Sequence, residues 1–230
     1  MAALIASAVL FLGSAALQLA ASLQRWVVFR RGRPPGEFAA EDHAYDYFIP
    51  TDPWESMGNA AILFGAATLV QACGVVSLAA GVALLPRTPG KKNGAAMAGG
   101  CVAAVLLAAW FTVQGIHALA SGVDGVPSSL QFAIYLWAPI SLAPIAMAVL
   151  WSGKSAAASA ASLFLLGSTF VGYFAANFIL APLVAGYTSH DTTPWMETVL
   201  AASTAGAAVA LIIAPRTVWR RGATPSAPGS

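Results

Sequence analysis

Charged residues are scarce in this chain: only 9% of its 230 residues are Asp, Glu, Lys or Arg, whereas 58% are hydrophobic. A soluble domain carries about 25% charged residues, so this chain has too few to cover a surface that faces water. The mean hydropathy of +0.74 agrees. The net charge is only +2, and the basic residues lie near the ends of apolar runs. Nucleic acid is therefore not expected as a partner.

Cysteine is almost absent as well. The two thiols, Cys73 and Cys101, both fall within apolar runs, and no Cys-x-x-Cys occurs. The sequence therefore gives no support for thiol–disulfide chemistry or for a cysteine-held metal, and we expect both thiols to be buried as small hydrophobic groups. A His-Glu-x-x-His zinc motif and a Ser–His nucleophile motif are also missing. No cofactor is clearly implied.

Long apolar runs make up most of the chain. A helix of roughly 20 apolar residues crosses the hydrocarbon core of a bilayer. We therefore expect an all-α fold, a polytopic transmembrane helix bundle of about six spans in three hairpins, forming one domain over 1–215. The expected spans are about 2–23, 57–85, 95–120, 131–151, 156–187 and 197–214. Residues 24–56 form a long polar connection, and 216–230 are expected to be a disordered tail.

Two of these spans have a second feature. The first ends in small residues, which also fits a cleaved signal peptide, but no Lys or Arg precedes it; we keep it as a span. The fourth contains Pro139 and Pro144, each of which removes a backbone donor, so we expect this helix to be kinked or opened.

The distribution of Lys and Arg predicts the orientation, because these residues are enriched on the cytoplasmic side. The residues that favour cytoplasmic termini are Arg87, Lys91, Lys92, Lys154, Arg216, Arg220 and Arg221. The residues that oppose it are Arg25, Arg30, Arg31 and Arg33. We expect a multi-pass protein of the cell membrane with both termini in the cytoplasm. The opposing set directly follows the first span, which leaves the reverse orientation open.

All acidic residues and histidines belong to one predicted face, at the connections between spans 1 and 2, 3 and 4, and 5 and 6. They are Glu37, Glu41, Asp42, His43, Asp46, Asp52, Glu55, His117, Asp124, His190, Asp191 and Glu197. Any site that uses carboxylates or imidazoles is therefore expected on this face.

Carboxylates and imidazoles cluster within the first and third of these connections. If "EDHAYD" is helical, Asp42 and Asp46 lie one turn apart with His43 beside them, a set suited to a divalent cation or to acid–base chemistry. His190 and Asp191 join them if both connections fold over one mouth. The catalytic candidates are Asp42, His43, Asp46, Glu55, His190, Asp191 and Glu197, and the metal candidates are Asp42, His43, Asp46 and His190. The competing interpretation is a solvated interfacial loop anchored by aromatic residues.

Two similar stretches, "PTDPWESMG" and "DTTPWMETV", each precede an apolar run. In the first, Asp52 is expected to cap a helix, with Pro53 as its first residue and Glu55 as its third. In the second, Thr193 caps the helix and Glu197 lies in the first turn. We interpret both as helix starts, with the two glutamates at the rim of any site.

Polar residues within the spans are few and uncharged, which disfavours a pump that uses a buried carboxylate. Gln114 and Asn177 are the candidates for lining a pore, because they lie about one turn from the acidic face. Each can instead bond a neighbouring helix.

Two hypotheses about function follow. The first is a channel, carrier or binding component for a small neutral or cationic solute, with an acidic mouth. The alternative is an integral membrane enzyme that acts on a lipid-like (isoprenoid or acyl) substrate through carboxylate and His chemistry at the interface. The expected partners are the lipid bilayer and that solute or substrate. The small-residue helix faces are also consistent with a homo-oligomer or an accessory subunit.

Overall fold

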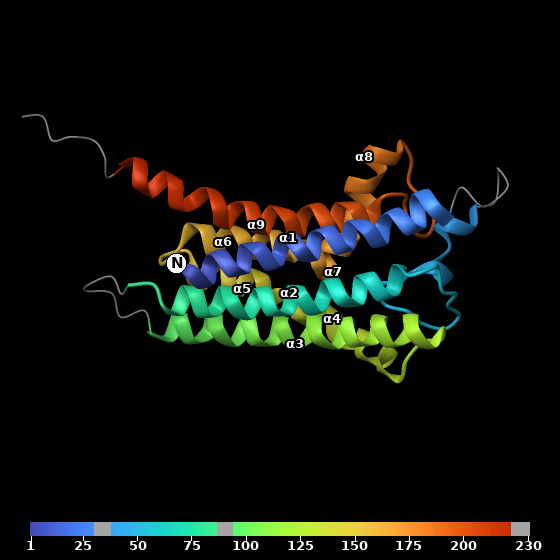
Figure 1. Ribbon diagram of the computed structural model, residues 1–230, viewed down its shortest axis with the longest axis horizontal. Helices are drawn as coiled ribbons and strands as arrows, with labels where there is room; N and C mark the ends of the chain where they lie inside the picture. Colours follow the sequence, from blue (N-terminus) through green and yellow to red (C-terminus); the bar gives the residue numbers. More distant parts are fainter. Residues whose placement is uncertain (30–37, 87–93, 222–230) are drawn as a thin grey trace, which may run out of the picture.

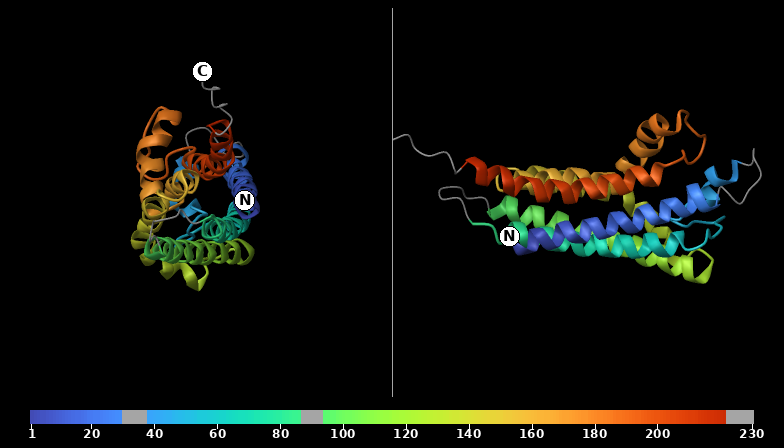
Figure 2. Two further views of the ribbon diagram at one scale, coloured as in Figure 1. Left: turned by 90° about the vertical axis from the view of Figure 1, so that its left-hand side faces the viewer. Right: turned by 45° about the horizontal axis from the view of Figure 1, so that its top comes forward.

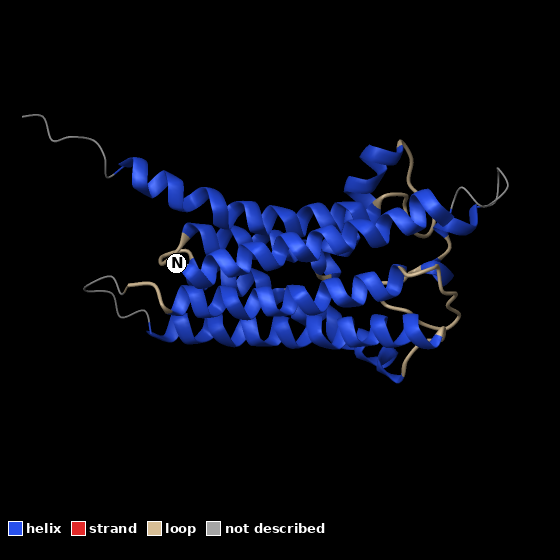
Figure 3. Cartoon of the chain, viewed as in Figure 1, coloured by secondary structure: helices blue, strands red, loops and turns tan. Residues whose placement is uncertain are grey.

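The computed structural model describes residues 1–29, 38–86 and 94–221, without the side chains of residues 38, 39, 134, 135, 137 and 214–221. Four long helices lie side by side (Figure 1): α1 (Ala2–Leu23), α2 (Ala60–Ala83), α3 (Gly94–Asp124) and α9 (Met196–Arg221). A π-helical turn, Gln24–Phe29, extends α1. The described part of the chain has no strand (Figure 3), which confirms the all-α prediction.

Shorter helices complete the bundle. They are α4 (Trp137–Ile140), α5 (Leu142–Trp151), α6 (Ala156–Leu165), α7 (Phe170–Ala175) and α8 (Ala181–Ala185). Neighbouring pairs α1–α2, α2–α3, α3–α5, α5–α6, α6–α9 and α9–α1 are in contact, so the six helices close into a ring. Figure 2 shows this ring along the bundle axis, with α8 projecting at its side.

Within the described residues, four helical stretches are long and apolar enough to cross a membrane: Ala2–Phe29, Ala60–Ala83, Gly94–Asp124 and Met196–Ile213. A fifth candidate is the pair Ala156–Ser168 and Phe170–Ala185, which is bent by 69°. The remaining expected span, 131–151, contains a shorter apolar helix, Ala138–Trp151. It is interrupted at Ser141, between α4 and α5, where Pro144 offers no N–H to the carbonyl of Ile140.

The outer surface of the bundle carries many large apolar side chains. Val9, Val105 and Leu142 are each more than 60% exposed, an arrangement that suits lipid rather than water. Helices approach closely where side chains are smallest: a Cβ on Gly65 of α2 would lie 2.7 Å from the Gly115 carbonyl oxygen of α3. The chain is therefore a multi-pass membrane protein.

The two ends of the bundle differ in what they carry. The start of α1 and the end of α9 lie at one end, while the connections around 38–59, 125–136 and 186–195 lie at the other (Figure 1). These connections and the helix ends beside them hold every described acidic residue and histidine. We call this the acidic end; of the predicted acidic face, only Glu37 lies outside the described residues.

Three local predictions need correction or a limit. Asp52 does not cap α2, which begins eight residues later at Ala60 after Asn59; segment 46–59 instead lies across the end of the bundle. Cys73 is exposed on the outer surface, and Cys101 is half-buried. The C-terminal helix continues to Arg221, and the expected tail beyond it falls outside the described residues.

Candidate functional site

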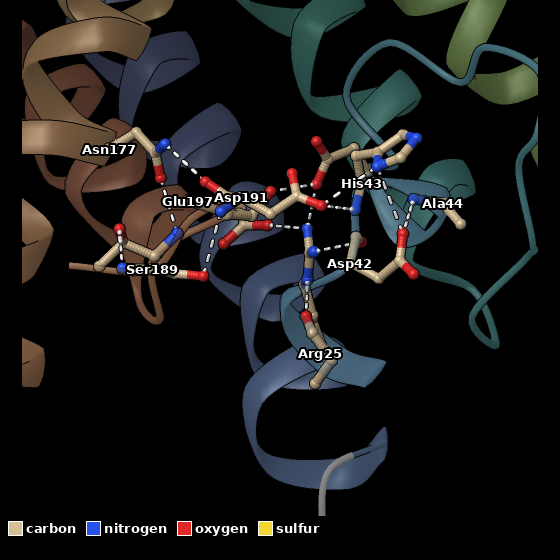
Figure 4. A network of polar contacts seen from close by, with 12 residues as sticks. Arg25, Asp42, His43, Ala44, Asn177, Ser189, Asp191 and Glu197 are labelled. Atoms are coloured by element: carbon tan, nitrogen blue, oxygen red, sulfur yellow. Dashed lines mark hydrogen bonds and ion pairs between the residues drawn. The ribbon is translucent and has the colours of Figure 1, made fainter. Parts of the chain in front are cut away.

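Arg25, on the π-helical turn after α1, is the centre of a buried ion-pair cluster (Figure 4). Its side chain is fully buried. Its Nη1 donates to Asp46 Oδ1 at 2.5 Å and to Glu197 Oε1 at 2.8 Å. Its remaining bonds reach backbone carbonyls, from Nε to Ala40 at 2.8 Å and from Nη2 to Asp42 at 3.1 Å. One guanidinium thus ties together α1, the first connection and α9.

The two carboxylates of this cluster are held by further donors. Trp26 Nε1 donates to Glu197 Oε2 at 2.6 Å, and Thr192 Oγ1 donates to Asp46 Oδ1 at 2.8 Å. Glu197 lies in the first turn of α9, as expected, but it is buried rather than at a rim. Burial raises the pKa of Asp46 to about 6, and Arg25 opposes that rise. Two carboxylates around one guanidinium leave the cluster with one surplus negative charge.

A second group, Asp42, His43 and Asp191, lies beside this cluster and is open to solvent (Figure 4). Asp42 caps the short turn His43–Tyr45, because its Oδ1 accepts from Ala44 N at 2.8 Å. Asp191 Oδ2 accepts from the backbone N of His43 at 2.7 Å and lies 3.1 Å from the ring Nδ1. The same Nδ1 is 3.4 Å from Asp42 Oδ1. The hydrogen bond to Asp191 raises the pKa of His43.

Asn177 holds the turn that carries Asp191 through hydrogen bonds. It is buried in the π-helical turn Ala176–Leu180. Asn177 Nδ2 donates to the Asp191 carbonyl at 2.9 Å, and its Oδ1 accepts from Thr193 N at 2.7 Å. Both ends of the amide are therefore bonded to the backbone of the third acidic connection.

An open pocket of about 580 Å³ lies between the first and third connections. Its lining is Glu41, Asp42, Tyr187, Thr188, Ser189, His190 and Asp191. Tyr187 donates its hydroxyl to a Glu41 carboxylate oxygen, and Thr192 N donates to the Glu41 carbonyl at 3.0 Å. These bonds join the two connections on either side of the pocket, which we call the acidic pocket.

The other predicted site residues lie elsewhere. Glu55 is exposed, accepts from Tyr45 OH at 2.8 Å and does not line the acidic pocket. Gln114 is buried on α3, where its Nε2 donates to the Phe48 carbonyl at 3.2 Å and its Oε1 has no partner among the described residues. It lines a small enclosed cavity in the bundle centre.

Arg25, which joins the first connection to α9, is not among the site residues that the sequence predicts. By sequence it bears only on orientation, as one of the basic residues that oppose cytoplasmic termini. The available signal was the apolar stretch Trp26–Phe29 that follows it: an Arg with apolar residues on both sides lies within a helical run and needs a buried partner.

Comparison with known proteins gives no match: no family model matches the chain, and no curated protein or solved structure is significantly similar to it. The class that the fold defines, a multi-pass helical membrane protein, therefore rests on its apolar helices, and the chemistry of its site rests on the geometry above.

Proposed function

We propose that this membrane protein binds a small cation in the acidic pocket, as a binding or collecting component for a cationic solute. The observation that carries the proposal is the composition of the pocket wall. It includes the carboxylates of Glu41, Asp42 and Asp191 and no described Lys or Arg. Arg25, the nearby buried cation, already faces Asp46 and Glu197. A cation in the pocket would therefore meet uncompensated negative charge.

The geometry favours a divalent metal ion as the simplest occupant. Asp42, His43 and Asp191 offer ligand atoms that all lie within 4.8 Å of one another, and a mixed imidazole and carboxylate set suits first-row divalent ions. The His43 ring lies between the two carboxylates, at 3.4 and 3.1 Å. When protonated, it supplies the positive charge that a bound metal would supply, so metal and proton compete.

For the location, we propose the cell membrane, with both termini in the cytoplasm and the acidic pocket outside. Two observations support this arrangement. The start of α1 and the end of α9 lie at the same end of the bundle (Figure 1). The larger set of Lys and Arg residues also belongs to that end by its place in the sequence.

Titration calorimetry of Mn²⁺ or Zn²⁺ into the purified full chain in detergent tests the proposal. We expect saturable binding that Asp191→Asn weakens at least about tenfold, the order found when a metal ligand environment is disrupted. Asn retains an oxygen that can accept from His43 N, so the turn should persist. Asp124→Asn is the matched control, because Asp124 is an exposed acid of the same end that does not line the pocket. Equal affinity in wild type and Asp191→Asn would refute the proposal.

A second candidate function is supported by the His43–Asp191 pair. An imidazole that a carboxylate orients beside an open pocket is the arrangement of a general acid–base. The side chain of Tyr187, which is 43% exposed, forms an aromatic part of the pocket wall. In this case the substrate is lipid-like. Incubation of the protein with lipid bilayers, followed by mass spectrometry, would reveal a product that disappears with His43→Gln. No product at any pH between 5 and 9 would eliminate the enzyme hypothesis and leave metal binding untouched.

A further inference from the structure

Helix α1 carries a stripe of buried polar side chains along its inner face: Ser7, Ser14, Gln18, Ser22 and, on the following turn, Arg25. Separations of three, four and seven residues return to the same helical face. Near the middle of the bundle, this stripe meets polar residues of three other segments. The described side chains at this meeting point are all uncharged, which distinguishes it from the acidic pocket.

At that point, four side chains form a closed ring of hydrogen bonds across the bundle. Gln18 Nε2 donates to Gln71 Oε1 of α2 at 2.9 Å, and Gln71 Nε2 donates to Ser168 Oγ at 2.9 Å. Ser168 Oγ lies 3.4 Å from Thr204 Oγ1 of α9, which donates to Gln18 Oε1 at 3.2 Å. Ser168 belongs to the break between α6 and α7, so the ring also fixes the bend.

This ring determines which hydrogen-bonding groups remain available. Gln18 Nε2 also donates to Ser14 Oγ at 3.1 Å, so both of its protons are used. Gln71 must then turn its oxygen toward Gln18, which directs its nitrogen away. Since an amide nitrogen carries two protons and one goes to Ser168, Gln71 keeps one further proton to donate.

Beside the ring is the enclosed cavity at the bundle centre, with a volume of about 10 Å³. Its polar lining comes from Gln18, Thr68, Gln71, Gln114, Ser168, Thr169 and Tyr173. Gln114 is only 4% exposed, and its Oε1 is a buried acceptor without a partner in the part of the chain that the structure describes. Thr68 donates its own proton to the Phe64 carbonyl at 2.7 Å, which leaves its oxygen free to accept. Among these lining groups, Gln114 Oε1 and Thr68 Oγ1 can therefore accept a hydrogen bond, and Gln71 Nε2 can donate one.

We propose that this cavity is a binding site for one small neutral molecule that both donates and accepts hydrogen bonds, and that water is that molecule. A water would donate to Gln114 Oε1 and Thr68 Oγ1 and accept the remaining proton of Gln71. The volume equals the space that one water requires. An ion is disfavoured, because none of the described residues that line the cavity carries a charge to offset the desolvation of the ion.

Aromatic and aliphatic side chains cover the cavity toward the two ends of the bundle. Phe48, on the first connection, covers the cavity toward the acidic end: its ring packs against Tyr173 at a tilt of 36° with centroids 4.8 Å apart, and its carbonyl accepts from Gln114. Toward the opposite end, buried Phe11, Leu78 and Leu107 fill the core.

Water contacts of the glutamine side chains provide the test, since the chain has only five glutamines. The full chain, labelled with ¹⁵N-glutamine and placed in lipid nanodiscs, is examined by NMR for cross-relaxation between water and each side-chain amide. We expect a cross-peak at Gln71 that is lost in Gln114→Leu, because Leu removes the acceptor and occupies the cavity. Gln131→Leu, a half-exposed position at the acidic end, should leave it unchanged.

Two results would overturn the proposal: no water contact at Gln71 in the wild type, or an undiminished contact in Gln114→Leu. If Gln114→Leu does not fold, Thr68→Val takes its place, since it removes one acceptor with little change of shape. The wild-type spectrum is decisive in either case. Metal binding at the acidic pocket is measured separately, so failure of one proposal is distinguishable from failure of the other.

Discussion

Arg25 Nη1 and Glu197 Oε1 lie 2.8 Å apart, although 172 residues separate them in the sequence. This ion pair joins the end of the first membrane helix to the start of the last. Both side chains are almost completely buried, so neither charge is well solvated without the other. The contact therefore helps to hold the ring of helices closed at the acidic end.

Loss of the guanidinium should be more harmful than loss of one carboxylate. Arg25→Gln leaves two carboxylates without a cation and should lower the free energy of unfolding by about 3–5 kcal/mol. Glu197→Gln leaves Arg25 paired with Asp46 and retains an acceptor for Trp26, so we expect a loss of roughly 1 kcal/mol. Unfolding in detergent, followed by tryptophan fluorescence, measures both; equal losses would contradict the surplus-carboxylate description.

Asp46 should make stability depend on pH. Its pKa is raised from 3.8 to about 6, so the folded protein binds this proton more tightly than the unfolded chain does. The resulting contribution to stability is complete below about pH 4 and is lost as the pH rises through about 6. Asp46→Asn does not titrate, so its Tm relative to wild type should increase between pH 4.5 and 7.5. A difference between the two proteins that is the same at both pH values would show that Asp46 does not titrate in this way.

His43 should report on Asp191. The hydrogen bond that the Asp191 carboxylate accepts from the His43 ring is the largest cause of the raised pKa of His43, so Asp191→Asn should lower that pKa toward 6.5. Titration of the imidazole Cε1 proton by NMR provides the measurement. Asp124→Asn removes a charge from the same end without touching His43, and we expect the His43 titration curve of this variant to match that of the wild type.

Binding of Mn²⁺ or Zn²⁺ should also depend on pH. A protonated His43 cannot bind a metal, so the affinity should rise as the pH rises and His43 loses its proton.

Asn177 should matter through the turn that it holds. Asn177→Leu removes two hydrogen bonds to the backbone of residues 191 and 193, which should cost about 1–3 kcal/mol of stability and weaken cation binding by loosening Asp191. Asn59→Ala is the control: its side chain makes no capping bond, so a change within about 0.5 kcal/mol is expected. A cation affinity of Asn177→Leu equal to that of the wild type would show that this turn does not determine binding.

The close approach of α2 and α3 can be tested with two glycines. A methyl group on Gly65 would lie 2.6 Å from Leu119 N, so Gly65→Ala should lower the free energy of unfolding by about 1–3 kcal/mol. On α1, Gly13 has open space where its Cβ would be. Gly13→Ala should therefore be neutral or stabilising, by up to about 1 kcal/mol. If Gly65→Ala leaves the free energy of unfolding unchanged, the close approach of α2 and α3 does not contribute to stability.

Several local details were beyond the reach of sequence reasoning, and the helix starts show why. The two Pro-Trp stretches look alike, and capping rules predicted a helix start at both. For α9 the prediction located the helix start to within two residues: the helix begins at Met196 rather than directly after Thr193, whose Oγ1 instead accepts from Ser189 N at 3.3 Å. It was wrong for α2, because residues 46–59 are held across the bundle end by contacts such as His117 Nε2 to the Pro50 carbonyl at 2.8 Å. Tertiary contacts of this kind leave no local signal.

Long apolar runs and the position of the polar residues between them can be read directly along the chain. The sequence by itself therefore determined the membrane class, the all-α architecture and the gathering of acids and histidines at one end. The pairing of polar groups was decided only by the tertiary structure. Three features depend on segments that meet only in the folded ring of helices. They are the proximity of Asp42 and His43 to Asp191, the burial of Glu197 against Arg25, and the position of the Gln114 Oε1 atom at the cavity. In a low-dielectric interior, each polar group must find its partner in three dimensions, and chain order does not reveal which partner that is.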